Sequence, residues 1–374
     1  MKKIKVAVVI PTHTNLNSSL HILLNVYKYL MRTKNIYVTI FTDIRNKNSY
    51  AGFNVVRIKG LDYNAVLSKG LFALGIPRYY YMDLIEKLEG YDIIETSNPE
   101  FYIFAYQSYL AAKKYNAKLI LRTSQTVEGF FLFKLSKYFV IPFARKAYDY
   151  ASWLLYTNPE AAERAERLGL MEKNSRRKII IGHATDTSLF NSISVKKNKK
   201  PIILSVAGLY KIKGHHLIIE AFVKIRKQID AELWIVGQGY YKKNLELLAE
   251  ELGISRSVKF LGSKTREELV TIYNKADVFV LANYQEITPA VNEALACNVP
   301  VVVMDCGGRN FVIPNESYGL IAKRFDTDDM SNKIIKLLKN KELANKLAQK
   351  GRNHVLKNFS IDKVAGKFYR CFVK

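Results

Sequence analysis

With 374 residues, the chain exceeds the length at which a single hydrophobic core stops growing, so we expect two domains. Its composition, 49% apolar and 24% charged, fits a globular protein, and no apolar run approaches the roughly 18 residues of a membrane-spanning helix. The net charge of +25 is spread over both halves and favours anionic partners, namely nucleotides, nucleic acid or a membrane surface. A generally lysine-rich composition without a specific partner is the alternative.

Strands and helices are predicted to alternate through the first half. The opening lysines and the apolar run up to Pro11 read as a first strand, because that run is too short for a signal peptide. Apolar runs predict strands at about 4–10, 36–42, 53–58, 93–96, 117–123, 153–157 and 178–182. The stretches between them predict helices at about 18–32, 79–90, 99–115, 128–149 and 159–168.

A polar segment at 191–200, followed by Pro201, marks the expected domain boundary. Beyond it, strands are predicted near 202–206, 231–236, 257–261, 277–281 and 299–303. Helices are predicted near 214–229, 241–252, 265–275, 289–297, 327–339, 342–356 and 361–372. This alternation predicts an α/β fold with two doubly wound, Rossmann-like domains, residues 1–190 and 191–357, and a ligand cleft between them. The C-terminal helix, about 358–374, is expected to pack back on the first domain.

Residues 276–303 are the most informative stretch, because they predict a strand, a helix and a second strand in succession. Thr288 suits the N-cap of the helix and Pro289 its first position, while Asn298 ends it. A helix that starts at the carboxyl end of a parallel strand presents free N–H groups and its positive dipole end to an anion such as a diphosphate. Glu293, just over one turn into the helix, is placed to reach a pair of sugar hydroxyls beside that phosphate.

A second anion-friendly helix start is predicted at 205–222. The small residues Ala207 and Gly208 let the backbone approach a ligand closely, and Lys213 offers a point charge to a phosphate. Taken alone, this stretch also reads as an ordinary strand-to-helix loop with a solvated lysine. Two such helix starts on one sheet reinforce each other and predict half of a nucleotide-sugar site.

The second half resembles the donor domain of retaining GT-B glycosyltransferases of family 4. V-A-G-L-Y-K-I-K-G stands where that family shows V-G-R-L-x-x-x-K-G, and the segment from Leu281 to Val302 resembles its P-S-x-x-E-G-F-G-x-x-x-x-E-A-M-A-C-G-x-P-V-V. D-C-G-G at 305–308 matches the next glycine pair, and I-I-I-G-H-A-T-D-T-S-L-F at 179–190 resembles the motif that ends the first domain. The likeness is good from about 179 to 340 and weak before that.

The resemblance implies a role for each matching residue. Lys213 would bind the donor diphosphate, and Glu293 would bind the ribose hydroxyls. Backbone N–H groups of the helix start would contact phosphates or sugar, and the residues concerned are Thr288, Pro289, Ala290 and Val291. The turn at 260–263, which contains Gly262, would lie near the base. The first domain would bind the acceptor.

Three positions depart from the family pattern and put the identity of the sugar in question. The phosphate arginine aligns with Gly208, which carries no charge. The first glutamate of the family's E-x7-E pair aligns with Gln285, and Glu286 is displaced by one position. Either Glu286 takes over that role or Gln285 binds the sugar hydroxyls as a neutral amide. Thr288 replaces a glycine.

The first half offers fewer candidate residues. The loop after the first strand lacks the usual glycines but carries His13. One interpretation is that His13 contacts the acceptor or a phosphate, and the alternative is that it is an ordinary surface histidine. Between 122 and 128 the polar groups include no convincing nucleophile, which fits retention with the donor phosphate helping to deprotonate the acceptor. No metal is expected, because Lys213 and helix N–H groups can neutralise the diphosphate. We interpret His183, His215 and His216 as structural.

Two basic, aromatic-rich segments, 71–81 and 129–153, suggest contact with an anionic membrane surface or a lipid acceptor. The plainer interpretation is a core helix with solvated lysines, because Pro142 is expected to break the helix. Three scattered cysteines indicate neither a disulfide framework nor a zinc site, and they favour a reducing, cytoplasmic setting, with the protein peripheral at the membrane face.

The leading hypothesis is therefore a retaining glycosyltransferase that moves a sugar from a nucleotide diphosphate sugar, with UDP-sugar favoured, to a lipid-linked or polysaccharide acceptor. The alternative is a catalytically silent nucleotide-sugar or glycan-binding protein, and a phosphorylase or epimerase is a further enzyme candidate. Specific nucleic-acid binding is not expected, because no basic helix stripe or recognition motif is present.

Overall fold

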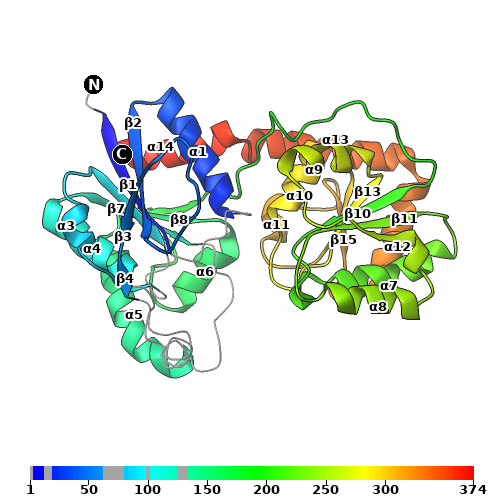
Figure 1. Ribbon diagram of the computed structural model, residues 1–374, viewed down its shortest axis with the longest axis horizontal. Coiled ribbons are helices and arrows are strands. Elements are labelled where there is room, and N and C mark those ends of the chain that lie inside the picture. The colour runs from blue at the N-terminus through cyan, green and yellow to red at the C-terminus, as the bar shows by residue number, and fades with distance from the viewer. Residues whose placement is uncertain (1–2, 12–18, 62–79, 98–101, 124–132) are drawn as a thin grey trace. The chain divides into compact units, whose positions relative to one another are not determined.

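The computed structural model describes residues 3–11, 19–61, 80–97, 102–123 and 133–374 (Figure 1). The chain divides into two compact units. Unit 1 contains Met1–His183 together with Asp362–Lys374, and unit 2 contains Ala184–Ile361.

Unit 1 is built on a parallel sheet with the strand order β3-β2-β1-β6-β7-β8-β9. Its strands are β1 (Ile4–Val9), β2 (Ile36–Asp43), β3 (Asn54–Ile58), β6 (Ile93–Ser97), β7 (Lys118–Thr123), β8 (Trp153–Tyr156) and β9 (Lys178–Ile180). A small antiparallel pair joins β4 (Gly60–Leu61) to β5 (Tyr80–Tyr81). The helices are α1 (Ser19–Thr33), α3 (Leu84–Lys87), α4 (Ile103–Tyr115), α5 (Phe133–Tyr150), α6 (Pro159–Arg167) and α14 (Ile361–Val373).

Helices cover both faces of this sheet. Helices α3 to α6 bury their apolar residues against one face. On the other, α1 and α14 lie side by side (Figure 1), and the rings of Tyr27 and Phe368 meet edge to face at 5.7 Å. The C-terminal helix is also tied to the strands, since Lys118 Nζ donates to the Phe372 carbonyl at 3.3 Å and Lys367 Nζ to the Ile180 carbonyl at 3.2 Å.

Unit 2 is built on a second parallel sheet with the order β12-β11-β10-β13-β14-β15. Its strands are β10 (Ile202–Val206), β11 (Glu232–Val236), β12 (Val258–Phe260), β13 (Val278–Leu281), β14 (Val301–Met304) and β15 (Leu320–Ala322). Its helices are α7 (His215–Arg226), α8 (Lys242–Glu251), α9 (Arg266–Lys275), α10 (Pro289–Ala296), α11 (Arg309–Val312), α12 (Thr327–Lys339) and α13 (Lys341–Asn358), with short 3₁₀ turns η1 (Lys211–Lys213) and η2 (Ser255–Ser257).

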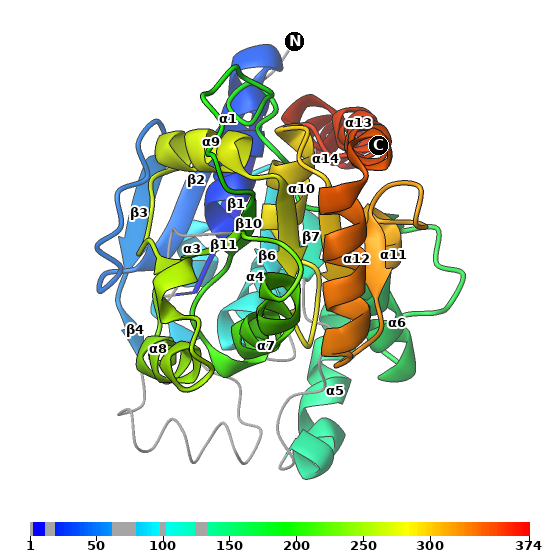
Figure 2. The same ribbon diagram turned by 90° about the vertical axis from the view of Figure 1, so that its right-hand side faces the viewer.

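The strands of unit 2 are apolar along their length because both faces of the sheet are covered. Ile203 of β10 packs toward α7, α8 and α12, whereas its neighbours Ile202 and Leu204 pack toward α9 and α10. Figure 2 shows these two groups of helices on opposite sides of the strands. The order places β10 beside β13, and their following helices leave to opposite faces, which defines the switch point of a doubly wound sheet.

The structure corrects several predicted elements. Helix α5 continues through Pro142, so that residue does not break it. The helix predicted at 79–90 is a two-residue strand followed by the single turn α3, and Asp83 before that turn has a left-handed backbone (φ 55°). The sequence analysis missed β4, β5, β15 and α11, which are all four residues or shorter. None of the helices in the described stretches is long and apolar enough to cross a membrane.

Candidate functional site

The carboxyl ends of β10 and β13 carry the predicted site residues of unit 2. Residues 207–214 follow β10, and residues 282–288 follow β13. Helix α7 then runs along one face of the sheet and α10 along the other. In a doubly wound sheet this divergence opens a crevice at the strand ends, where ligands bind.

The loop after β10 sets Lys213 against the loop after β13. Gly214 has a left-handed backbone (φ 70°), and a Cβ there would lie 2.0 Å from the Ala282 carbonyl oxygen, so only glycine fits this contact. Burial lowers the pKa of Lys213, while the nearby Glu286 and Cys306 oppose that shift. Within the described part of the chain, Lys213 has no acidic partner at ion-pair distance. This half-buried ammonium group is thus available to an anion.

Gly208, where the resemblance places an arginine, is covered by an aromatic ring. A Cβ on Gly208 would lie 2.7 Å from Cε2 of Tyr210. The Tyr210 ring thus fills the space through which a side chain at 208 would leave. A longer side chain at 208 would therefore require the Tyr210 ring to move.

The loop after β13 is held on two sides. The Tyr284 N–H donates to the Ile212 carbonyl at 3.0 Å, next to Lys213, and Arg324 Nη2 donates to the Tyr284 carbonyl at 2.9 Å. On the other side, the Ile287 N–H donates to the Gly307 carbonyl at 2.8 Å. These bonds fix the backbone from which Gln285 and Glu286 project.

Gln285 and Glu286 differ in what their positions offer. The Gln285 side chain belongs to an exposed residue, and the backbone carbonyl of Gln285 accepts from the Gly307 N–H at 3.0 Å. Glu286 is half-buried, its carbonyl accepts from Asn283 Nδ2 at 2.7 Å, and its carboxylate lies within electrostatic range of Lys213. The structure therefore brings Glu286 to the predicted phosphate lysine and leaves the Gln285 amide facing solvent. The role of each toward a sugar stays a prediction.

Helix α10 begins as predicted, with Thr288 at the N-cap and Pro289 in the first turn. The Thr288 side chain caps no N–H, and its buried Oγ1 has no hydrogen-bond partner among the described residues. Pro289 has no N–H, and the Val291 N–H already donates to the Thr288 carbonyl at 3.1 Å. Of residues 288–291, only Thr288 and Ala290 therefore keep an N–H group that could contact the phosphates or the sugar of a donor.

Glu293 lies in the second turn of α10 and is held by α9. The Tyr273 hydroxyl donates to Glu293 Oε2 at 3.0 Å, which leaves Oε1 for a ligand. Burial raises the pKa of Glu293, and the Tyr273 hydrogen bond and the charge of Arg266 oppose that shift. A carboxylate held in this way can accept from paired hydroxyls.

The remaining predicted residues lie apart from this cluster or outside the description. Gly262 has a left-handed backbone (φ 69°), and its carbonyl accepts from the Gly237 N–H at 2.9 Å, so it forms a tight turn after β12. His13 lies outside the described residues, as do residues 71–79 and 129–132 of the two basic, aromatic segments. His215 is buried, its Nδ1 is 3.3 Å from Ser205 Oγ, and burial lowers its pKa to about 4.

Sequence reasoning missed Tyr273, Tyr284 and Arg324. Tyr273 is one of the buried residues of α9, so the sequence predicts only a core residue there. Its partner carboxylate, Glu293, comes from another helix and cannot be found from the sequence of α9. Tyr284 and Arg324 act through backbone hydrogen bonds, which no side-chain motif reports. In the described stretches, no group of three or more His, Cys, Asp and Glu could hold a metal ion.

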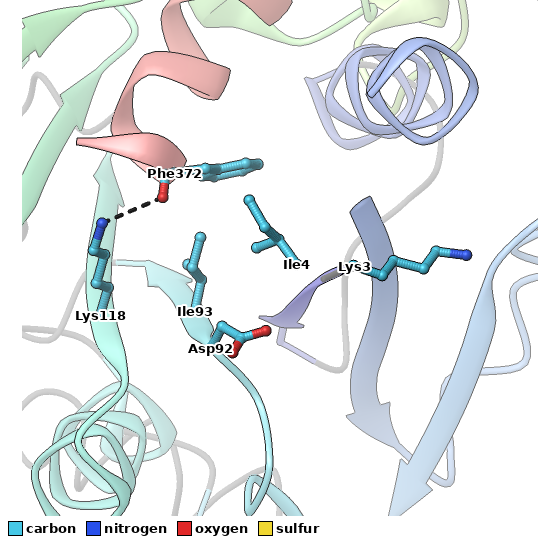
Figure 3. Close-up of a pocket in the computed structure, with 6 residues that line it drawn as sticks. All are labelled: Lys3, Ile4, Asp92, Ile93, Lys118 and Phe372. Atoms are coloured by element: carbon cyan, nitrogen blue, oxygen red, sulfur yellow. Dashed lines mark hydrogen bonds between the residues drawn. The ribbon is translucent and has the colours of Figure 1, made fainter. Parts of the chain in front are cut away.

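A small cavity of about 200 Å³ lies elsewhere in unit 1 (Figure 3). It is lined by Lys3, Ile4, Asp92, Ile93, Lys118 and Phe372. Phe372 comes from α14, and the other five lie at the amino ends of β1, β6 and β7, opposite the edge at which doubly wound sheets bind ligands.

The fold is of the doubly wound α/β class, and the candidate residues of unit 2 gather at its switch point. Residues 187–354 match the model of the family described as Glycosyl transferases group 1. The match confirms the predicted family resemblance.

Individual relatives show the same family resemblance. The chain is 27% identical over 183 residues to N-acetyl-alpha-D-glucosaminyl L-malate synthase of Bacillus anthracis, which covers 49% of this chain and 47% of the relative. It is 27% identical over 304 residues to N,N'-diacetylbacillosaminyl-diphospho-undecaprenol alpha-1,3-N-acetylgalactosaminyltransferase of Campylobacter jejuni, covering 75% and 77%. For relatives such as the first, the matched stretch spans about half the length of the protein.

A solved structure extends the likeness to nearly the whole chain. The structure of Anabaena HepE in complex with UDP superimposes with a TM-score of 0.76 over 98% of this chain and 99% of that chain, at 14% identity. At this identity the likeness shows the fold alone. It confirms the predicted GT-B class with two Rossmann-like domains.

Proposed function

We propose that the protein is a retaining glycosyltransferase that uses a nucleotide diphosphate sugar, with UDP-sugar favoured. The observation that carries the proposal is the convergence of Lys213, the start of α10 and Glu293 at the switch point of one parallel sheet. These are a cation and N–H donors for a diphosphate, and a carboxylate for ribose hydroxyls. The names of the relatives, and the UDP bound in HepE, support the same chemistry.

In this proposal the site acts mainly by stabilising the departing diphosphate. Lys213 and the N–H groups of Thr288 and Ala290 receive the charge that develops on the leaving phosphate. The freed phosphate oxygen helps to deprotonate the acceptor on the same face of the sugar, which retains its configuration. Glu286 or Gln285 orients the sugar hydroxyls.

The proposed acceptor is a lipid-linked or polysaccharide intermediate held by unit 1, with the protein peripheral at a cytoplasmic membrane face. The relative from Campylobacter jejuni is named for a diphospho-undecaprenol acceptor. The charge of +25 would attract such an anionic acceptor and an anionic membrane surface.

The first experiment measures calorimetric binding of UDP, GDP and ADP to the wild type, Lys213→Gln, Glu293→Gln and the control Lys211→Gln. We expect one nucleotide to be preferred, with affinity on the order of 10- to 100-fold weaker in the first two variants, as for lost charged hydrogen bonds. Lys211 is an exposed neighbour of Lys213, so its variant should bind normally. Equally weak binding of all three nucleotides, unchanged by every substitution, would show that net charge alone attracts them.

The second experiment tests sugar transfer. The donors are a panel of sugar conjugates of the nucleotide that binds best in the first experiment. The anomeric configuration of the product, read by NMR, should match that of the donor, and inversion would contradict the proposed mechanism. One observation favours the alternative of a catalytically silent binder, namely the Tyr210 ring over Gly208 in place of an arginine. Tight, Glu293-dependent nucleotide binding without turnover on any acceptor would support that alternative.

A further inference from the structure

Two exposed aromatic rings stand at the carboxyl edge of the unit 2 sheet, beside the proposed phosphate site. Tyr240 is 75% exposed and Tyr210 is 44% exposed. Their ring centroids are 5.5 Å apart with the planes tilted by 45°. Tyr210 precedes Lys213 by three residues, and its carbonyl accepts from the Lys213 N–H at 2.9 Å.

The backbone beneath these rings is held by close contacts between two loops. A Cβ on Gly237 would lie 2.0 Å from the Ala207 carbonyl oxygen, and one on Gly239 would lie 2.2 Å from that of Leu209. The Leu209 N–H donates to the Gln238 carbonyl at 2.8 Å. The ends of β10 and β11 are therefore locked together, so both rings rise from a fixed base.

The neighbouring tyrosine fixes the direction of Tyr240. Tyr241 packs edge to face against His216 of α7, at 6.0 Å between the ring centroids, and its N–H donates to the Leu209 carbonyl at 3.0 Å. With Tyr241 engaged below, Tyr240 is left to solvent at the strand ends. Among the described residues, Tyr240 belongs to neither apolar cluster of unit 2, and its ring contacts are those with Tyr210 and Tyr241.

Aromatic rings lie on both sides of the switch point. Toward β14 and β15 lie the charged groups Glu286 and Arg324 and the Phe325 ring, which packs edge to face against Tyr284 at 4.9 Å. Toward β11 lie the two tyrosine rings. Glu293 is supported from the β12 side, because Tyr273 and Arg266 come from α9, the helix that follows β12. With its diphosphate at Lys213, a nucleotide would therefore extend its nucleoside toward β11 and β12.

We propose that Tyr240, backed by Tyr210, is the stacking platform for the nucleobase of the donor. This inference rests on the proposed function and adds an aromatic contact for the base, on the loop whose Gly237 N–H donates to the carbonyl of Gly262 in the turn at 260–263. Stacking on an aromatic face accepts any base, so the platform supplies affinity and leaves the choice of base to polar contacts. The Tyr240 ring, and not its hydroxyl, is the recognition element.

The test compares UDP with inorganic pyrophosphate, which carries the phosphates without the base. Calorimetric affinities for both ligands and for a UDP-sugar are measured for the wild type, Lys213→Gln, Tyr240→Ala, Tyr240→Phe and Phe325→Ala. Phe325, 50% exposed, is the matched control, because it follows β15 at the same edge but on the other side of the switch point. We expect Tyr240→Ala to weaken UDP binding on the order of tenfold, with pyrophosphate binding unchanged and Tyr240→Phe near wild type.

Other results would overturn the inference, and they separate it from the proposed function. If Lys213→Gln loses both ligands while Tyr240→Ala binds UDP normally, the phosphate site stands and the platform is wrong. If Phe325→Ala loses UDP affinity instead, the nucleoside extends toward β15. If Tyr240→Ala weakens only a UDP-sugar, the rings contact the sugar. If the wild type binds neither ligand, the proposed function itself fails.

Discussion

The hydrogen bond between Tyr273 and Glu293 gives the sharpest test of how unit 2 holds the carboxylate that we propose binds the ribose hydroxyls. Its length is 3.0 Å, and it opposes the rise in the pKa of Glu293 that burial causes. Tyr273→Phe removes the hydroxyl but keeps the ring contacts with Phe190 and Phe279. Because a hydrogen bond to a charged group is worth about 1.5–3 kcal/mol, we expect a loss of that size in the free energy of unfolding near neutral pH.

The loss should depend on pH in a defined direction. The folded pKa of Glu293 already lies above its ordinary value of 4.5, so the contribution of this group to stability is full below that value and declines as the pH rises through the raised pKa. Without the Tyr273 donor the folded pKa rises further, which extends the decline. The variant should therefore be closer to wild type at about pH 4.5 than at about pH 7.5.

Urea unfolding of the wild type, Tyr273→Phe, Glu293→Gln and the double variant, at both pH values, completes the cycle. We expect a coupling energy of about 1 kcal/mol or more near neutral pH. A coupling below about 0.5 kcal/mol, or an equal loss at both pH values, would refute the reasoning, because the hydroxyl would then contribute nothing to holding the carboxylate. UDP affinity should fall in Tyr273→Phe, since Glu293 is then no longer oriented.

Two further predictions concern the loops and the other sheet. Gly214→Ala should destabilise by about 2–4 kcal/mol and weaken UDP binding, whereas Gly253→Ala, which has the same left-handed backbone but nothing within 4 Å, should cost only about 1–2 kcal/mol by thermal unfolding. Equal losses would remove the argument for the close contact with Ala282. In unit 1, Arg122→Leu should cost about 3–5 kcal/mol near neutral pH, because it strands the buried Glu95. Burial raises the pKa of Glu95, so unfolding titrations should show a smaller cost below its ordinary value of 4.5.

The sequence predicted the regular elements well where one signal dominated. The strands of unit 2 are buried on both faces, so each appears as a continuous apolar run, and the predicted 202–206 is β10 without change. Asn298 was expected to end α10, and it has the left-handed backbone (φ 61°) that asparagine tolerates. Short elements such as β15 were not predicted, because three residues are too few to show a hydrophobic periodicity.

Side-chain partnerships between helices could not be predicted. Tyr273 and Glu293 are 20 residues apart, and nothing in either helix indicates that the two would meet. In the motif comparison, Gly208 differs from the family only by the absence of an arginine charge. The structure shows in addition that the Tyr210 ring lies where a side chain at position 208 would begin. Such pairs depend on how loops fold over strand ends, and a motif comparison treats each position alone.

Lys213 and Glu293 also bear on the choice between an enzyme and a silent remnant of one. Each charge is partly buried, which costs free energy, as the lowered pKa of Lys213 and the raised pKa of Glu293 both show. Lys213 has no ion-pair partner among the described residues, so no ion pair offsets the cost of burying its charge. A chain that needed only this fold would avoid the cost of the Lys213 charge with an apolar residue at that position. The proposed donor would neutralise the first charge and hydrogen-bond to the second.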